Sequence, residues 1–168
     1  GATGQSRQAE PLTTMHFLLA AALALTADPT PDVAGTPVQS NLEYSMPIAG
    51  DWTYAPTSDG SHAVFANSSG QPQLTIRCTK STRRVALLKA VSSASPSIWV
   101  WTSSQKKNLP ATYDSSSGQV IADLAAYDPL LDAIASSRGR VGFSTSGLEA
   151  LVVPPWADIA RVIEDCRV

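Results

Sequence analysis

The sequence predicts a single α+β domain that is mostly β. We expect an antiparallel β-sandwich or barrel-like sheet of about seven or eight strands, with two short helices and an extra N-terminal helix. Three observations support this fold class. Short apolar runs, several of them alternating, recur between clusters of turn-forming residues. Helical spacing of apolar residues is found mainly near the C-terminus. The length of 168 residues suits one domain.

The N-terminal part, residues 1–27, is predicted to be an apolar helix or a signal-like segment. Residues 15–27 read MHFLLAAALALTA, which resembles the apolar region of a signal peptide and is too short to span a bilayer, which takes about 20 apolar residues. The alternative is a packed helix with Pro11 near its first turn. Residues 28–41 contain three prolines and one glycine and are predicted to be a linker, so the β-rich domain covers 42–168.

The first half of this domain is predicted to contain four strands. They cover Trp52–Tyr54, His62–Ala66, Leu74–Cys78 and Val85–Val91. The clearest alternation places Leu74, Ile76 and Cys78 on an inner face and Arg77 on the outer one. The polar turn that follows Cys78 predicts a hairpin with the next strand.

The second half contains a strongly apolar segment, Ser97–Thr102, whose residue types favour a strand. Both of its faces are apolar, which predicts a strand that is either central in its sheet or covered by helices. Further strands are expected at 118–124, 141–144 and 148–153, and the intervening segment 103–118 is interpreted as a loop.

Two helices are predicted near the C-terminus. The first begins at Asp128-Pro129, because Asp is a good N-cap and Pro fits the first helical position, and it is expected to end at Gly139. The second follows Pro154-Pro155. Its buried side is predicted from helical spacing to contain Trp156, Ile159, Ala160, Ile163 and Cys166.

The two cysteines are predicted to form a disulfide. Cys78 ends the inner face of a strand, and Cys166 ends the buried side of the last helix, so each is placed inward on independent grounds. Bridges of this kind persist in oxidising compartments, which favours a periplasmic or secreted protein. The alternative is two buried free thiols that never meet.

Composition argues against several function classes. The net charge of −2 does not favour nucleic-acid binding, which needs a basic face. Two Cys and two His lack the spacing of a zinc site, so no metal and no cofactor is expected. Charged residues make up 15%, against about 25% in an average domain. This composition fits an exported β-protein.

The order of the features resembles that of a known type of protein. The pattern comprises a Trp-containing strand near residue 52, Leu74–Cys78, Trp101 with Ser103, Asp128–Leu130, Gly139–Phe143, Gly147-Leu148 and Ile163–Cys166. It resembles small exported bacterial proteins of the invasion-associated locus B type, and equally type VI secretion accessory proteins of the VasI kind. The resemblance covers about 52–166, although the second cysteine pair of the locus B type is missing. It implies an envelope β-sandwich with a binding or accessory role and transfers no catalytic residue.

Two groups of residues are candidate binding sites. Trp99 and Trp101 share one strand face and are suited to stacking on a sugar or a peptide, unless they belong to the core. Arg77, Arg83 and Arg84, together with Lys80, surround a hairpin turn. They are suited to an anionic partner such as lipid headgroups or an acidic protein, unless they form an ordinary solvated turn.

No catalytic constellation is evident, so no catalytic residue is assigned. His62 is the only histidine of the main domain. The carboxylate pairs considered for acid–base chemistry fall mostly in turns or caps: Asp51/Asp59, Asp114/Asp123 and Asp128/Asp132.

The sequence therefore favours a non-enzymatic periplasmic or envelope accessory or binding protein. Its expected partner is another envelope protein, and the N-terminal apolar segment makes a homo-oligomer conceivable. The alternatives are a small exported hydrolase that uses His62 and a protease-inhibitor-like module that presents loop 103–118.

Overall fold

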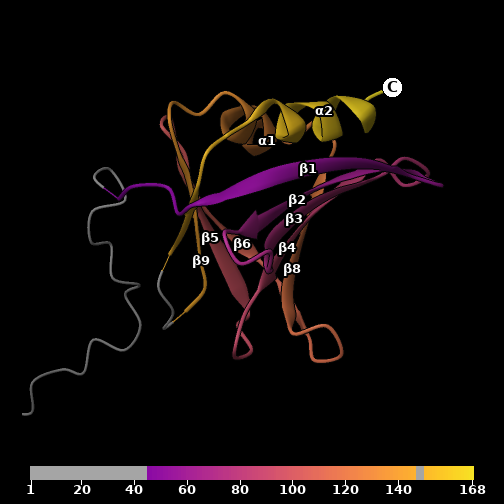
Figure 1. Cartoon of the computed structure of the whole chain (residues 1–168). Helices are drawn as coiled ribbons and strands as arrows, with labels where there is room; N and C mark the ends of the chain where they lie inside the picture. Colours follow the sequence, from indigo (N-terminus) through magenta and orange to yellow (C-terminus); the bar gives the residue numbers. More distant parts are fainter. Residues whose placement is uncertain (1–44, 147–149) are drawn as a thin grey trace, which may run out of the picture. The chain divides into compact units, whose positions relative to one another are not determined.

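A computed structural model describes residues 45–146 and 150–168 of the chain. Within these ranges it contains ten strands, which form two antiparallel sheets, and two helices (Figure 1). The predicted α+β, mostly β fold with two short helices is thus confirmed. The apolar segment 15–27, the linker 28–41 and the dipeptide Gly147-Leu148 lie outside the described residues.

The larger sheet has six strands, and the smaller sheet has four. In spatial order the larger sheet contains β1 (Gly50–Thr57), β2 (Gly60–Asn67), β3 (Pro72–Thr79), β4 (Arg84–Ala90), β8 (Gln119–Ala125) and β7 (Thr112–Asp114). The smaller sheet contains β10 (Leu151–Val153), β9 (Val141–Ser144), β5 (Ser97–Trp101) and β6 (Lys106–Pro110). The helices are α1 (Pro129–Ala135) and α2 (Ala157–Asp165).

Strands β1 to β4 form a simple meander of hairpins, of which the β3–β4 hairpin was predicted. On β3, Leu74, Ile76 and Cys78 are at most 1% exposed, whereas Arg77 is exposed. Gly60, at the start of β2, has a φ of +137°, and a Cβ there would collide with the carbonyl oxygen of Cys78. Only glycine therefore allows the β1–β2 turn to close against β3.

Strand β5 is central, because it pairs with β6 on one side and with β9 on the other. Its inward residues, Ile98 and Val100, are fully buried. Trp99 and Trp101 lie on the opposite face and are partly buried. We call this second face the outer face of the smaller sheet.

The interpretation of 103–118 as a loop was wrong, because the segment contains β6 and β7. Its run Lys106-Lys107-Asn108 has no alternation, and among the residues of β6 only Leu109 is buried. The chain passes from one sheet to the other between these strands, where Ala111 N donates a 2.9 Å hydrogen bond to Pro96 O. These two strands account for the excess over the seven or eight expected.

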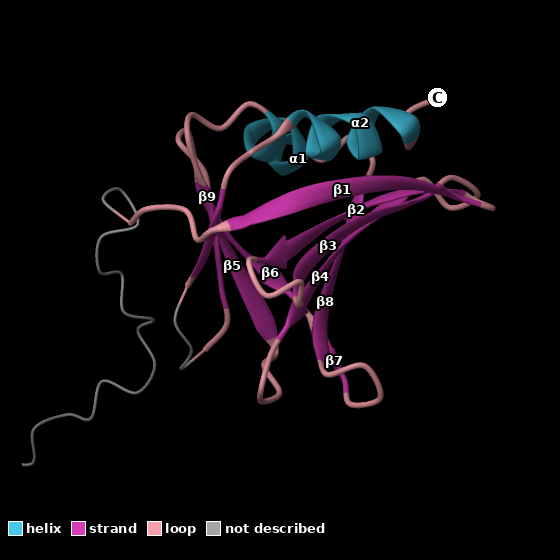
Figure 2. Cartoon of the chain, in the orientation of Figure 1, coloured by secondary structure: helices cyan, strands magenta, loops and turns pink. Residues whose placement is uncertain are grey.

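The two helices pack on one side of the larger sheet, which we call its inner face (Figure 2). Asp128 caps α1 by accepting a 2.9 Å hydrogen bond from Leu130 N, as predicted. The helix ends at Ala135 and not at Gly139, because the backbone leaves the helical conformation at Ser136 (φ −97°, ψ 5°) and Ser137 N–H then bonds Ile134 O, three residues back.

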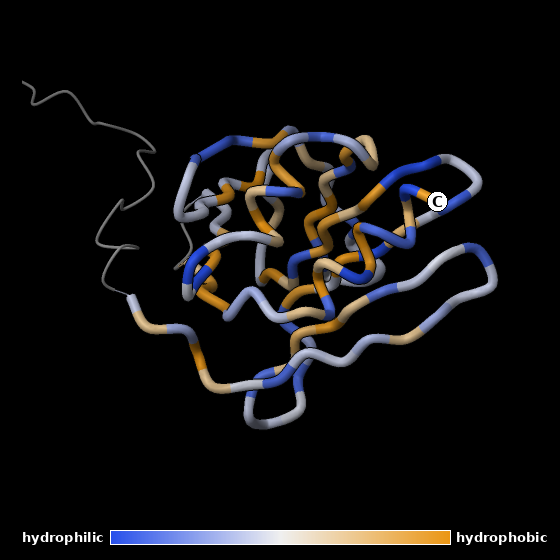
Figure 3. Tube along the Cα trace, turned by 90° about the horizontal axis from the view of Figure 1, so that it is seen from above, coloured by the Kyte–Doolittle hydropathy of each residue, from blue (hydrophilic) through white to orange (hydrophobic). Residues whose placement is uncertain are grey.

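Helix α2 alternates hydrophobic and hydrophilic residues along its length (Figure 3). Ile159, Ile163 and Cys166 are buried as predicted, and Val162 joins them. Trp156 was wrongly assigned to this side: it is 43% exposed, because the helix begins only at Ala157.

Candidate binding surfaces and the disulfide

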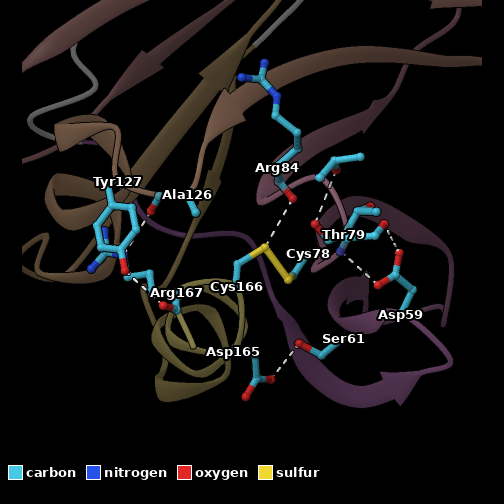
Figure 4. The surroundings of a disulfide bond; sticks show 12 residues. Asp59, Ser61, Cys78, Thr79, Arg84, Ala126, Tyr127, Asp165, Cys166 and Arg167 are labelled. Atoms are coloured by element: carbon cyan, nitrogen blue, oxygen red, sulfur yellow. Dashed lines mark hydrogen bonds between the residues drawn. A yellow bond between two sulfur atoms is a disulfide. The ribbon is translucent and has the colours of Figure 1, made fainter.

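The predicted disulfide between Cys78 and Cys166 is present, and it joins β3 to the end of α2 (Figure 4). The two Cα atoms are 5.4 Å apart, and both residues are at most 1% exposed. Arg84 O lies 3.2 Å from Cys166 Sγ. This is a close contact and not a hydrogen bond, because a disulfide sulfur has no proton to donate. The alternative of two free thiols is therefore wrong.

A second connection lies beside the disulfide. Ser61 Oγ and Tyr54 Oη donate hydrogen bonds of 2.6 and 2.8 Å to Asp165 Oδ2 (Figure 4 shows the first). Burial raises the pKa of Asp165, but these two bonds, with the charges of Lys80 and Arg161, outweigh it and leave the pKa below 3.8. The carboxylate thus fixes α2 to β1 and β2 while it is ionised.

His62 lies on the other face of the sheet from this connection. Side chains alternate along a strand, so Ser61 points inward to Asp165 while His62 points outward. On the outer face of the larger sheet, His62 is paired in register with Arg77 of β3. A serine, a histidine and a carboxylate occur together in this region, but Ser61 and Asp165 do not face His62.

The carboxylates that were considered in pairs serve separate local roles. Asp59 accepts hydrogen bonds from the backbone N–H and the hydroxyl of Ser81, and these bonds lower its pKa. Asp114 accepts from Ser116 and Ser117 in the β7–β8 turn, which lowers its pKa likewise. Asp51 lies at the start of β1, and Asp123 lies on β8. Asp128 is the N-cap of α1, and Asp132 forms an ion pair with Arg167.

Trp99 and Trp101 form an aromatic pair on the outer face of the smaller sheet. Their ring centroids are 6.0 Å apart, and their planes differ by 28°. Lys106 Nζ lies 5.6 Å from the centroid of the Trp99 ring. The residues paired with them on β9 are small: Ser144 opposite Trp99 and Gly142 opposite Trp101. Small neighbours leave room for two indole rings beside each other on one sheet face.

The predicted basic cluster surrounds the β3–β4 turn. Arg77, Lys80, Arg83 and Arg84 are all exposed. Arg77 and Arg84 belong to the outer face of the larger sheet, since their strand neighbours Ile76 and Val85 point inward. Arg83 adopts a φ of 51° in the turn itself. The structure therefore brings Arg77, Arg83 and Arg84 together at one end of one sheet, while the tryptophans lie on the other sheet.

Sequence reasoning missed Lys89, which lies on the inner face of β4. It is 6% exposed, and burial lowers the pKa of its ammonium group. Its Nζ donates a 3.4 Å hydrogen bond to Ala90 O. The sequence held a signal, because Lys89 continues the alternation of Val85 and Leu87. Lys106 was missed as well, since its strand was taken for a loop.

No protein-family model, curated protein or solved structure matches this chain. Over residues 45–146 and 150–168, no group of three His, Cys, Asp or Glu is arranged to hold a metal ion. Neither helix found in those ranges is long and apolar enough to cross a membrane.

Proposed function

We propose that the chain is an exported, non-enzymatic binding or accessory protein of the cell envelope, periplasmic or secreted. In this proposal it binds its ligand or partner through Trp99, Trp101 and Lys106 on the outer face of the smaller sheet. The observation that carries the proposal is the partly exposed tryptophan pair, with centroids 6.0 Å apart on a strand that is paired on both sides.

The physical argument concerns indole rings left in contact with water. A tryptophan that is fully covered buries about 150–250 Å². Leaving part of that area in water forfeits roughly 25 cal/mol for each Å². A ligand that covers both rings recovers this free energy. Because β5 is central, the rings are held before binding, which lowers the entropy cost of association.

Export is supported by the disulfide, because such bonds persist where thiols are not kept reduced. The resemblance to exported accessory proteins points to the same compartment. Another envelope protein is the partner class that fits a surface with both aromatic rings and a cation.

The experiment compares three proteins as bait in envelope extracts. They are the wild type, the double variant Trp99→Ala/Trp101→Ala and the control Tyr113→Ala, which removes a 38% exposed aromatic ring from β7. We expect one retained species that the double variant loses and the control keeps. Equal retention by all three baits would refute the tryptophan surface.

Export is tested separately, by the intact mass of the protein made from its natural gene and alkylated without reductant. A mass without alkyl groups is expected. Two alkyl groups would mean a reduced protein and would overturn the envelope location.

A further inference from the structure

Two hairpin turns lie side by side at one end of the larger sheet, at the right of Figure 1. Asp59, in the β1–β2 turn, connects the two turns. Lys80 N donates a hydrogen bond of 2.9 Å to Asp59 O, and Ser81 N donates one of 3.0 Å to Asp59 Oδ1. These hydrogen bonds fix the β3–β4 turn against its neighbour, so the charged groups around it are held in one place. Both turns are hydrophilic in Figure 3.

We call the cations at this end the basic end; they are Arg77, Lys80, Arg83 and Arg84. Within the described residues, none of the four forms an ion pair within 4.0 Å. Other cations of the domain do have partners: Arg167 pairs with Asp132 and Glu164, and Lys107 pairs with Asp128. The basic end therefore keeps guanidinium donors that no carboxylate of the described chain occupies.

Two acidic groups beside these turns are already engaged with hydroxyl groups. Asp59 is bonded to Ser81, and Asp165 is bonded to Ser61 and Tyr54. Their negative charges remain and offset part of the field of Lys80. The bonds from Ser81 are the main cause that lowers the pKa of Asp59, and burial of Asp165 is outweighed by its bonds to Ser61 and Tyr54; the charge of Lys80 adds to both. The three arginines contribute the charge that is left for an outside partner.

We propose that the basic end binds the phosphate groups of an anionic phospholipid surface. Guanidinium groups match phosphate oxygens with paired N–H donors and keep their charge at any physiological pH. Arg77 and Arg84 extend from the outer face and Arg83 from the turn beside them. The three therefore reach a surface that lies across this end of the sheet.

The composition of the basic end favours a lipid surface over an acidic protein. Between residues 77 and 84 the only apolar side chain is Cys78, which is 1% exposed and bonded to Cys166. Stable protein interfaces have an apolar or aromatic core, and residues 77–84 offer none. A bilayer with anionic headgroups presents many phosphates in one plane and needs no such core.

This surface is distinct from the tryptophan pair, because the two lie on different sheets. Bilayer contact through the basic end would hold the domain at the membrane while the outer face of the smaller sheet remains accessible. The inference does not depend on the ligand of the tryptophan pair, and each surface can fail its test alone.

The test is sedimentation of the full chain with vesicles of phosphatidylcholine, with and without phosphatidylglycerol. The variant is Arg77→Gln/Arg84→Gln, and the control is Arg138→Gln, which removes one exposed arginine from the segment after α1 and reports the effect of a lost charge outside the basic end. All three proteins contain the same N-terminal apolar segment, so differences between them arise from the arginines. Both positions of the variant are exposed, and a retained disulfide and unchanged thermal midpoint will verify its fold.

We expect binding only with phosphatidylglycerol, weakened by added salt. The double variant should bind about 25-fold more weakly, at about fivefold for each arginine, and the control should bind like the wild type. Equal binding to both kinds of vesicle, or equal loss by variant and control, would overturn the proposal. Binding to soluble polyglutamate without binding to vesicles would also overturn it and would assign an acidic protein instead.

Discussion

The disulfide gives the prediction that the structure defines best. Reducing it removes a crosslink between residues 88 positions apart, without changing any other covalent bond. Loop-closure entropy gives about 4.6 kcal/mol of stabilisation at about 25 °C for a loop of this length. A domain of this size typically has about 5–15 kcal/mol in total, so the bond is a large part of it.

The assay is urea unfolding, followed by tryptophan fluorescence, with and without a phosphine reductant. With a urea slope of about 2 kcal/mol per molar, the reduced protein should unfold at about 2 M less urea. Cys78→Ala serves as a second measurement, because it removes the same bond without any reductant and adds the cost of a lost buried side chain. It should therefore unfold at or below the urea concentration of the reduced wild type. Identical midpoints for oxidised and reduced wild type would refute the reasoning.

Three further predictions concern single side chains. Lys89→Met should raise stability at neutral pH, because a buried ammonium is replaced by an apolar chain. Because the pKa of Lys89 is lowered in the folded state, the unfolded state binds more protons than the folded state in the pH range just below 10.5. The stability of the wild type should therefore rise with pH in that range, and the stability of Lys89→Met should not. Denaturant titrations that give the two proteins equal pH profiles would contradict this. Asp165→Asn should flatten the acid side of the stability profile, because a carboxyl with a folded pKa below 3.8 stabilises above pH 4 and loses this effect as pH falls; an unchanged profile would count against it. Asp128→Ala should cost about 1–2 kcal/mol in urea unfolding through the lost cap of α1, whereas Asp128→Asn keeps the cap and should cost less; equal losses would argue against capping.

Local patterns predicted much of the fold. The alternation of Leu74, Ile76 and Cys78 placed β3 and its inward face correctly, because side chains of a strand alternate whatever surrounds it. The Asp128-Pro129 start of α1 was equally readable, since capping is a matter of a few neighbouring residues. The strands β6 and β7 were not predicted, because Lys106 and its neighbours are polar and β7 has only three residues, so neither shows an apolar alternation. Each becomes a strand by forming a hairpin with its apolar neighbour in the sequence, β5 for β6 and β8 for β7.

The two candidate surfaces also differ in how much of each could be predicted from the sequence. The sequence placed Arg77, Arg83 and Arg84 at one turn, because residues close in sequence around a hairpin must be close in space. It could not decide which face of β5 is covered, since both faces are apolar. Only the packing of the two sheets showed Ile98 and Val100 inside and the tryptophans outside.

Local sequence was enough to predict the fold class, the inward direction of both cysteines and the start of α1. These features depend on periodicity and on contacts a few residues apart. Two features became evident only in the folded chain: Ser61 bonds Asp165 on the face away from His62, and Lys89 is buried. Each of these depends on which distant segment covers a given face of a strand, and local sequence does not specify that partner.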